Sequence, residues 1–235
     1  MPAQPPPTVL VHGIRVSRTM WHPVADRLRA AGHKVEALDL PGHGVRRGEP
    51  FTLAAAVAAV TEAIDAVGGR ALVAGLSLGG FVSIATAAAH PERVAGLVAM
   101  GCTTRPRGAY AMLYRRMAAL AGASPRRADR LSAFTFSRLL PGAPGRAVLE
   151  GGLSSEVMPA AAAAIMGYDP IAALAAYPGP VTLVNGSRDP FRADERDFLA
   201  ACRDGRLIVI PGRGHIDLLA DPATLTGILH EVATR

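Results

Sequence analysis

The chain has 235 residues, of which half are hydrophobic and 19% are charged, so it is long enough to bury the core of one α/β domain and too apolar to be disordered. The net charge of +6 comes almost entirely from arginine, and neither a nucleic-acid-binding motif nor many aromatic residues accompany it, so we expect no nucleic acid as a partner. Because no stretch has the features of a membrane span or a signal peptide, and the two separated cysteines form no metal motif, the sequence predicts a cytoplasmic protein without membrane partner, metal or cofactor.

Short apolar runs alternate with helical patterns along the first part of the chain. Residues 8–11 are apolar or β-branched and predict a buried strand, whereas residues 20–31 have helical spacing that ends at Gly32. The same alternation continues with strands predicted at 33–39, 70–74 and 94–100, and helices at 52–67 and 78–90.

The alternation stops over residues 103–168, where helical pieces and Pro-Gly breaks occur without a clear strand. It resumes with strands predicted at 181–184 and 206–210 and helices at 192–202 and 222–233. Strands that alternate with helices predict a mostly parallel sheet with helices on both faces. We therefore predict an α/β fold in which residues 1–102 and 169–235 form the core and residues 103–168 form a helical cap insertion.

The segment Gly75-Leu76-Ser77-Leu78-Gly79 has the G-x-S-x-G pattern and lies between a predicted strand and a predicted helix. A sharp turn there strains the backbone of Ser77 and leaves room only for small residues two positions away on each side. The alternative is a glycine-rich turn with a capping serine. The strand and helix on either side favour a nucleophile held at the carboxyl end of the sheet.

A serine nucleophile needs a base and an orienting acid, and the chain offers both in the order Ser, Asp, His. His215 follows the sixth predicted strand and is the predicted base, and Asp189 follows the fifth and is the predicted acid. Asp189 has an alternative role as a turn residue before Pro190. Three further aspartates, Asp169, Asp194 and Asp197, are weaker alternatives for the acid because they fall at the cap exit or in a helix.

The oxyanion of an acyl-transfer reaction needs preorganised hydrogen-bond donors. We predict the backbone N–H of Leu78, directly after the nucleophile, and that of Ile14, in the loop after the first strand. Met20 and Trp21 lie close to that loop in sequence and are predicted to touch the substrate.

These segments, together with Asp39-Leu40-Pro41-Gly42-His43-Gly44, resemble the α/β-hydrolase superfamily over residues 9–233. The resemblance implies that Asp39 and His43 have structural roles. The N-terminal third is similar to small plant methyl-esterases and hydroxynitrile lyases. Those lyases carry a lysine after the catalytic histidine and replace the glycine of His-Gly, whereas this chain has Ile216 and Gly13, which favours hydrolysis. Because few residues precede the first strand, we predict six parallel strands.

The sequence thus predicts a serine hydrolase that cleaves a carboxylic ester of a small or medium-sized molecule. A thioesterase, a lactonase and a carbon–carbon bond hydrolase would use the same triad, and a non-catalytic binding module on the same fold is an alternative of another class. A basic predicted cap could attract an anionic or carrier-bound substrate, although arginine-rich solvated helices are the simpler interpretation. Its arginines are Arg105, Arg107, Arg115, Arg116, Arg126, Arg127, Arg130, Arg138 and Arg146.

Overall fold

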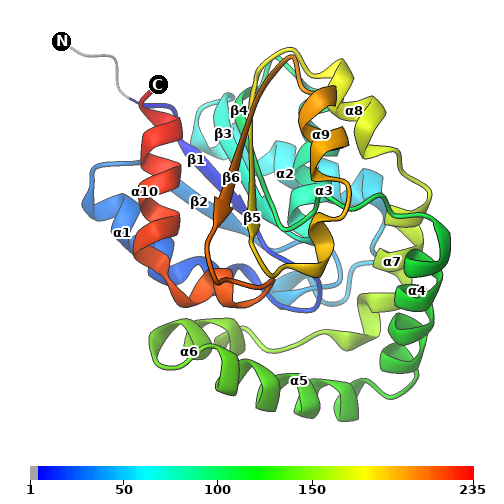
Figure 1. Ribbon diagram of the computed structural model, residues 1–235. Coiled ribbons are helices and arrows are strands. Elements are labelled where there is room, and N and C mark those ends of the chain that lie inside the picture. Colours follow the sequence, from blue (N-terminus) through cyan, green and yellow to red (C-terminus); the bar gives the residue numbers. More distant parts are fainter. Residues whose placement is uncertain (1–4) are drawn as a thin grey trace.

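The computed structural model describes residues 5–235, and its centre is one parallel sheet of six strands (Figure 1). The strand order is β2-β1-β3-β4-β5-β6, and every neighbouring pair is parallel, as predicted. The chain leaves β1 toward one edge and returns to β3 on the other side, so the order switches between β1 and β3. The strands are β1 (Thr8–Val11), β2 (Val35–Leu38), β3 (Ala71–Leu76), β4 (Val94–Met100), β5 (Pro180–Gly186) and β6 (Asp204–Ile210).

Helices cover both faces of the sheet, because successive strand residues point to opposite sides and both sides are apolar. Val9 and Val11 belong to one core cluster and Leu10 to the other. The first cluster includes side chains of α2 (Leu53–Val67), α3 (Leu78–Ala89), α8 (Pro170–Ala176) and α9 (Glu195–Ala201). The second includes side chains of α1 (His22–Ala30) and α10 (Pro222–Ala233).

Between β4 and β5 the chain forms a helical segment that reaches across the carboxyl ends of the strands (Figure 1). Helices α5 and α6 lie beneath those strand ends, and α4 and α7 lie at one side of them. The short helix α8, which the sequence analysis did not predict, begins where the Asp169 side chain accepts hydrogen bonds from Ile171 N and Ala172 N. The helices of the segment are α4 (Gly108–Ala123), α5 (Pro125–Leu139), α6 (Ala143–Glu150), η3 (Ser155–Val157) and α7 (Met158–Met166).

Two predicted helices begin differently in the structure, each because a side chain caps a short 3-10 turn. Ser17 caps η1 (Arg18–Trp21), so α1 follows it from His22. Asp189 caps η4 (Pro190–Arg192), so the helix predicted from residue 192 begins as α9 at Glu195. The remaining 3-10 turns are η2 (Gly44–Arg46) and η5 (Asp217–Ala220).

Within residues 5–235, no single helix is long and apolar enough to cross a membrane. The two helical pieces Ser155–Met166 and Pro170–Ala176 pass that test of length and composition only when taken together, and they are bent by 63° relative to each other.

Candidate active site

Ser77 occupies the sharp turn between β3 and α3, at the point where the strand order switches. Its backbone is left-handed, with φ 57° and ψ −116°, and its N–H donates a 2.8 Å hydrogen bond to Met100 O at the end of β4. A Cβ on Gly75 would collide with the carbonyl oxygen of Gly79, and one on Gly79 with that of Val11. Glycine at both positions therefore allows β3, α3 and β1 to approach closely enough to form this turn.

Asp189 and His215 meet at the carboxyl edge of β5 and β6. Asp189 Oδ2 lies 2.9 Å from His215 Nδ1, and Oδ1 accepts a 2.7 Å hydrogen bond from Phe191 N. A carboxylate can only accept a hydrogen bond, so the proton of the His215 ring lies on Nδ1. The other ring nitrogen, Nε2, is then free to accept a proton. The Asp189 side chain is fully buried, whereas that of His215 is 14% exposed and lines the same cavity as Ser77.

The two loops that carry this pair are held to each other by backbone contacts. Arg188 N donates to Arg213 O at 2.8 Å, and Ser187 N donates to Ile210 O at 2.9 Å. A Cβ on Gly186 would collide with the carbonyl oxygen of Arg213, so the approach of these loops needs glycine at the end of β5. The hydrogen bond between Asp189 and His215 is thus set by rigid strand ends.

Gly101, directly after β4, packs closely against Asp189 and His215, and the sequence analysis did not single it out. Its φ is +57°, and an added Cβ would lie 2.9 Å from His215 Nδ1 and 3.0 Å from Asp189 Oδ2. The signal that could have found it is its position, because a glycine directly after a buried strand often marks a close approach of another group.

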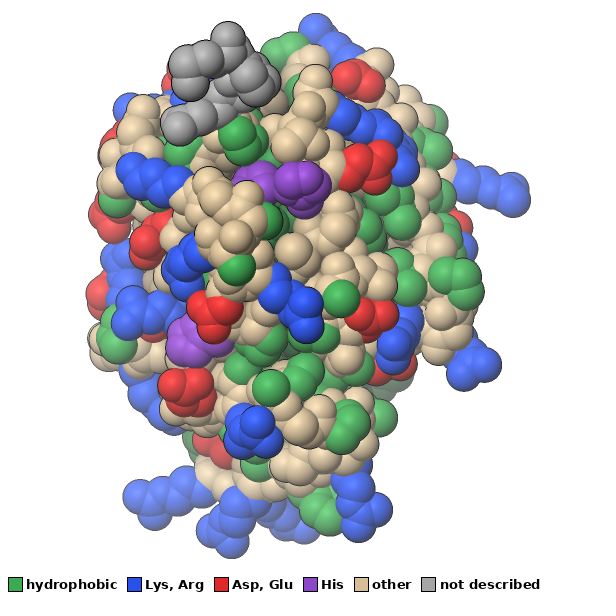
Figure 2. Space-filling view, turned by 90° about the vertical axis from the view of Figure 1, so that its left-hand side faces the viewer, with side chains coloured by type: hydrophobic (Ala, Val, Ile, Leu, Met, Phe, Trp, Pro, Cys, Tyr) green, Lys and Arg blue, Asp and Glu red, His purple; other side chains and the backbone are tan. Residues whose placement is uncertain are grey.

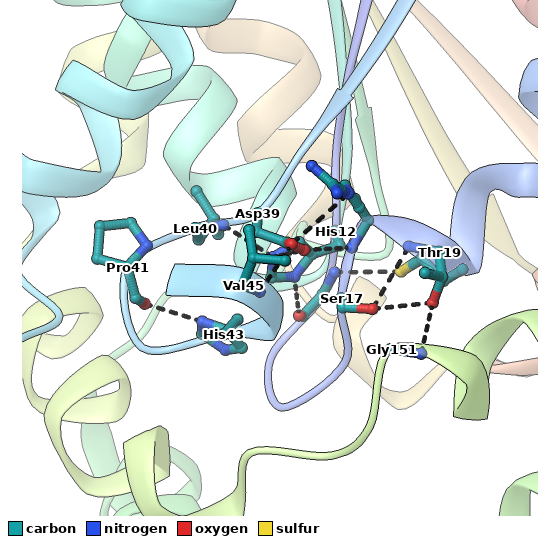
Figure 3. A network of polar contacts seen from close by, with 12 residues as sticks. His12, Ser17, Thr19, Asp39, Leu40, Pro41, His43, Val45 and Gly151 are labelled. Atoms are coloured by element: carbon teal, nitrogen blue, oxygen red, sulfur yellow. Dashed lines mark hydrogen bonds and ion pairs between the residues drawn. The ribbon is translucent and has the colours of Figure 1, made fainter. Parts of the chain in front are cut away.

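The loop after β1 is fixed from below by a buried polar network (Figure 3). Leu40 N donates to His12 Nε2 at 2.9 Å, so the ring proton lies on Nδ1, which donates to Gly13 O at 2.7 Å. Burial, and then the neighbouring His43, lower the pKa of His12 well below its usual value, which keeps the ring neutral. The Asp39 carboxylate accepts from Arg18 N and Val45 N, which is the structural role expected for it.

Ile14 and Leu78, the two predicted oxyanion donors, both lie against Ser77. Ile14 lines both cavities that Ser77 lines, and Leu78 lines the smaller one. Gly13 N donates to Met20 Sδ at 3.4 Å, whereas Ile14 N has no hydrogen-bond partner among the described residues. Leu78 is the first residue of α3, so its N–H has no partner within the helix. These two N–H groups therefore remain available to an oxyanion.

The two cavities meet at Ser77 and share Ile14, Tyr114 and Phe191 as lining residues. The larger has a volume of about 340 Å³ and the smaller about 70 Å³. The ring of Phe191 lies 4.5 Å from that of His215, measured between centroids, and is a second feature that sequence reasoning missed.

Met20 lines the larger cavity, whereas Trp21 does not line either of the two. Trp21 is fully buried in the core cluster that α1 and α10 form with the sheet, so the expectation that it touches the substrate is wrong. The reason is the 3-10 turn η1, which places Met20 on the cavity side and the next residue in the core.

The other aspartates considered as the acid lie elsewhere. Asp169 caps α8, Asp194 Oδ2 accepts from Arg105 N at 2.6 Å, and Asp197 forms an ion pair with the Arg105 side chain. Cys102 lies near Asp189, but burial, and then that charge, raise the pKa of its thiol, so it stays neutral and unreactive. No cluster of three or more metal-binding side chains is present in the part of the chain that the structure describes.

Comparison with known proteins gives one family match and several relatives of full or partial length. The model of a family described as the Alpha/beta hydrolase family matches residues 8–226. A pimeloyl-[acyl-carrier protein] methyl ester esterase of Edwardsiella ictaluri is 28% identical over 96% of this chain and 92% of its own length. The enzyme of the same name from Neisseria meningitidis is 42% identical, but that match spans only 37% of this chain and 33% of the relative. The structure of a thermophilic esterase from Thermogutta terrifontis superposes with a TM-score of 0.78 and 25% identity, covering 98% of this chain and 90% of that one.

Proposed function

Because this chain belongs to the α/β-hydrolase family and is a hydrolase, we propose that it cleaves carboxylic esters of small or medium-sized molecules through an acyl intermediate on Ser77. The observation that carries the proposal is the 2.9 Å hydrogen bond between Asp189 and His215 beside a cavity that Ser77 also lines. The ester-cleaving names of the two esterases described above support the same type of bond.

In the proposed reaction, Ser77 Oγ attacks the ester carbonyl carbon while His215 Nε2 accepts its proton. Asp189 holds the ring in the required tautomer and stabilises the imidazolium. The N–H groups of Leu78 and Ile14 receive the oxyanion, and the dipole of α3 adds to their effect. His215 then returns the proton to the leaving alcohol, and a water molecule activated by the same ring releases the acid from Ser77. No step calls on a metal or an organic cofactor.

The test is hydrolysis of p-nitrophenyl esters from acetyl to decanoyl. We expect turnover by the wild-type protein and none by Ser77→Ala, with Ser137→Ala, at an exposed position of α5, as the matched control. Asp189→Asn should lose about 10⁴-fold in kcat, as in the analogous protease triad, whereas Asp197→Asn at the exposed ion pair should not. Equal turnover by wild type and Ser77→Ala would refute the proposal.

We further propose that the ester is presented by an acidic carrier protein on a cap formed by residues 103–168. Leu113 and Met117 of α4 line the larger cavity and are 57% and 53% exposed, so the cavity opens at this helix. Exposed arginines project from the end of the molecule that α5 and α6 occupy in Figure 1, which Figure 2 shows as blue side chains. Among the described residues, Arg126, Arg127 and Arg130 form no ion pair. The two pimeloyl-[acyl-carrier protein] esterases support this presentation by their names.

Carrier presentation predicts that an ester attached to an acyl carrier protein has a higher kcat/KM than the free ester, and that added salt removes the advantage. The double variant Arg126→Glu, Arg130→Glu should lower kcat/KM for the carrier-bound ester only. Arg27→Glu, at an exposed position of α1, is the control. Equal loss with the free ester would refute carrier docking. A cytoplasmic location, which the two unpaired cysteines favour, is part of the same proposal.

A further inference from the structure

Arg15 follows Ile14 in the loop after β1 and has a backbone conformation that arginine rarely adopts. Its φ is +58°, and only Ser77 shares a positive φ with it among the described residues other than glycine. Glycine adopts this conformation without steric cost, so an arginine held there indicates that its side chain is needed at this position.

The Arg15 side chain turns into the molecule and meets helix α5. Nη1 donates a 2.6 Å hydrogen bond to Ser132 Oγ, and the guanidinium carbon lies 5.6 Å from the centroid of the Phe136 ring. No carboxylate of the described residues lies within 4.0 Å of the guanidinium nitrogens. The carboxylate of Asp129 affects its pKa, and Oδ1 of that carboxylate already accepts from Ser155 N.

Burial lowers the pKa of Arg15, which reflects the loss of water around the guanidinium, while electrostatic contributions from Tyr114 and Asp129 act in the opposite direction. The guanidinium stays charged because arginine does not deprotonate in proteins. A partly buried cation without an adjacent anion gains free energy when a ligand supplies the opposite charge.

Arg15 lines the larger cavity together with Ser77 and His215. It is the only permanently charged residue of that lining, which is otherwise apolar apart from Ser77, Tyr114 and His215. A volume of about 340 Å³ accommodates a small ester with a second functional group. An ester held at Ser77 can therefore place a carboxylate against a partly desolvated guanidinium within one cavity.

We propose that Arg15 binds a carboxylate of the substrate, so that this site selects esters that carry a free carboxylate. The planar guanidinium, with nitrogens not used by Ser132, matches a carboxylate through two parallel hydrogen bonds. A neutral chain in the same place would leave the guanidinium partly desolvated without a charged partner. The inference rests on the proposed ester cleavage at Ser77, and it adds the class of substrate.

The test compares carboxylate esters with their neutral carboxamide counterparts. Monomethyl glutarate and its amide place the group on the acyl side, and 4-acetoxybutanoate and its amide place it on the alcohol side. We expect the wild-type protein to favour the carboxylate of at least one pair by about 10- to 100-fold in kcat/KM. Arg15→Gln should abolish this preference while changing kcat/KM for the amide less than about threefold.

Two further variants separate recognition from folding. Arg15→Gly relaxes the backbone at φ +58° and should lose the preference in the same way. Arg18→Gln removes a nearby, half-exposed cation that does not line the cavity, and should keep the preference. The proposal is overturned if the wild-type protein shows no preference in either pair, or if Arg15→Gln lowers both members of a pair equally, which would indicate a structural anchor for α5.

Binding of glutarate to Ser77→Ala, measured by calorimetry, distinguishes failure of this inference from failure of the proposed function. Heat of binding that disappears in Ser77→Ala, Arg15→Gln supports the carboxylate site even if no ester is cleaved. If the wild-type protein cleaves esters but shows no charge preference and Ser77→Ala does not bind glutarate, the role of Arg15 is refuted. The proposed ester cleavage at Ser77 is then still supported.

Discussion

Gly101, directly after β4, is the glycine at which an added Cβ would press on both Asp189 and His215. An alanine Cβ there would lie 2.9 Å from His215 Nδ1, whereas ordinary contacts begin at 3.4 Å, so the ring or the backbone must shift by about 0.5 Å. The same Cβ would lie 3.0 Å from Asp189 Oδ2, so movement of the ring alone does not relieve the contact. We predict that Gly101→Ala separates the pair and lowers kcat by about 10- to 100-fold, because errors of about 1 Å in such geometry cost about 10²-fold.

The substitution also strains the backbone, since φ is +57° at this position, and this should cost about 1 kcal/mol of unfolding free energy. Gly32→Ala is the matched control, because Gly32 has φ +87° and no atom within 4 Å of an added Cβ. It should lose similar stability and keep wild-type kcat. Urea unfolding and p-nitrophenyl butyrate hydrolysis measure both quantities. If Gly101→Ala keeps wild-type kcat while losing as much stability as Gly32→Ala, the contact with Asp189 and His215 does not control the chemistry.

Three further substitutions separate stability from activity. Because the pKa of buried His12 is lowered, the unfolded chain binds a proton that the folded chain does not below about pH 6.5, and stability falls there as pH falls. His12→Gln should reduce this slope in urea unfolding by about 1.4 kcal/mol per pH unit, and an unchanged slope would contradict the assignment. Tyr177→Phe removes a buried 3.0 Å hydrogen bond to Val94 O and should cost about 1 kcal/mol in thermal unfolding without changing kcat. Phe191→Ala removes the ring packed on His215 and should lower kcat/KM about 2- to 10-fold with p-nitrophenyl esters, and a stability loss without that effect would make the ring structural.

The parts of the fold that the sequence predicted are those that local patterns determine. Each strand of a parallel sheet is buried on both faces, so it appears as an apolar run with a turn at its carboxyl end. Ser77, Asp189 and His215 each follow such a run, and parallel strands bring their carboxyl ends to one edge. The placement of these residues at one edge of the sheet therefore needed only the strand positions and the chain order.

The remaining features depend on partners that are distant in the chain. Arg15 and Ser132 are 117 positions apart and meet only because α5 crosses the strand ends. The expectation that Trp21 touches the substrate failed for a similar reason. Its closeness to Ile14 in sequence does not tell which side of the turn η1 faces the cavity. The hydrophobic pattern of the sequence predicts neither the contact of Arg15 with Ser132 nor the burial of Trp21, because both depend on packing between elements.

The loop after β1, which carries the predicted oxyanion donor Ile14, is joined by hydrogen bonds to the helical segment that crosses the strand ends. Ser154 N donates to Arg15 O at 2.8 Å, and Thr19 Oγ1 donates to Ala147 O at 2.6 Å while accepting from Gly151 N (Figure 3). The position of the Ile14 N–H therefore depends on where this segment rests. A shift of the segment on substrate binding would move an oxyanion donor, and changes there should alter kcat as well as KM. We therefore expect kcat of this chain to respond to changes in the segment that local sequence patterns describe least.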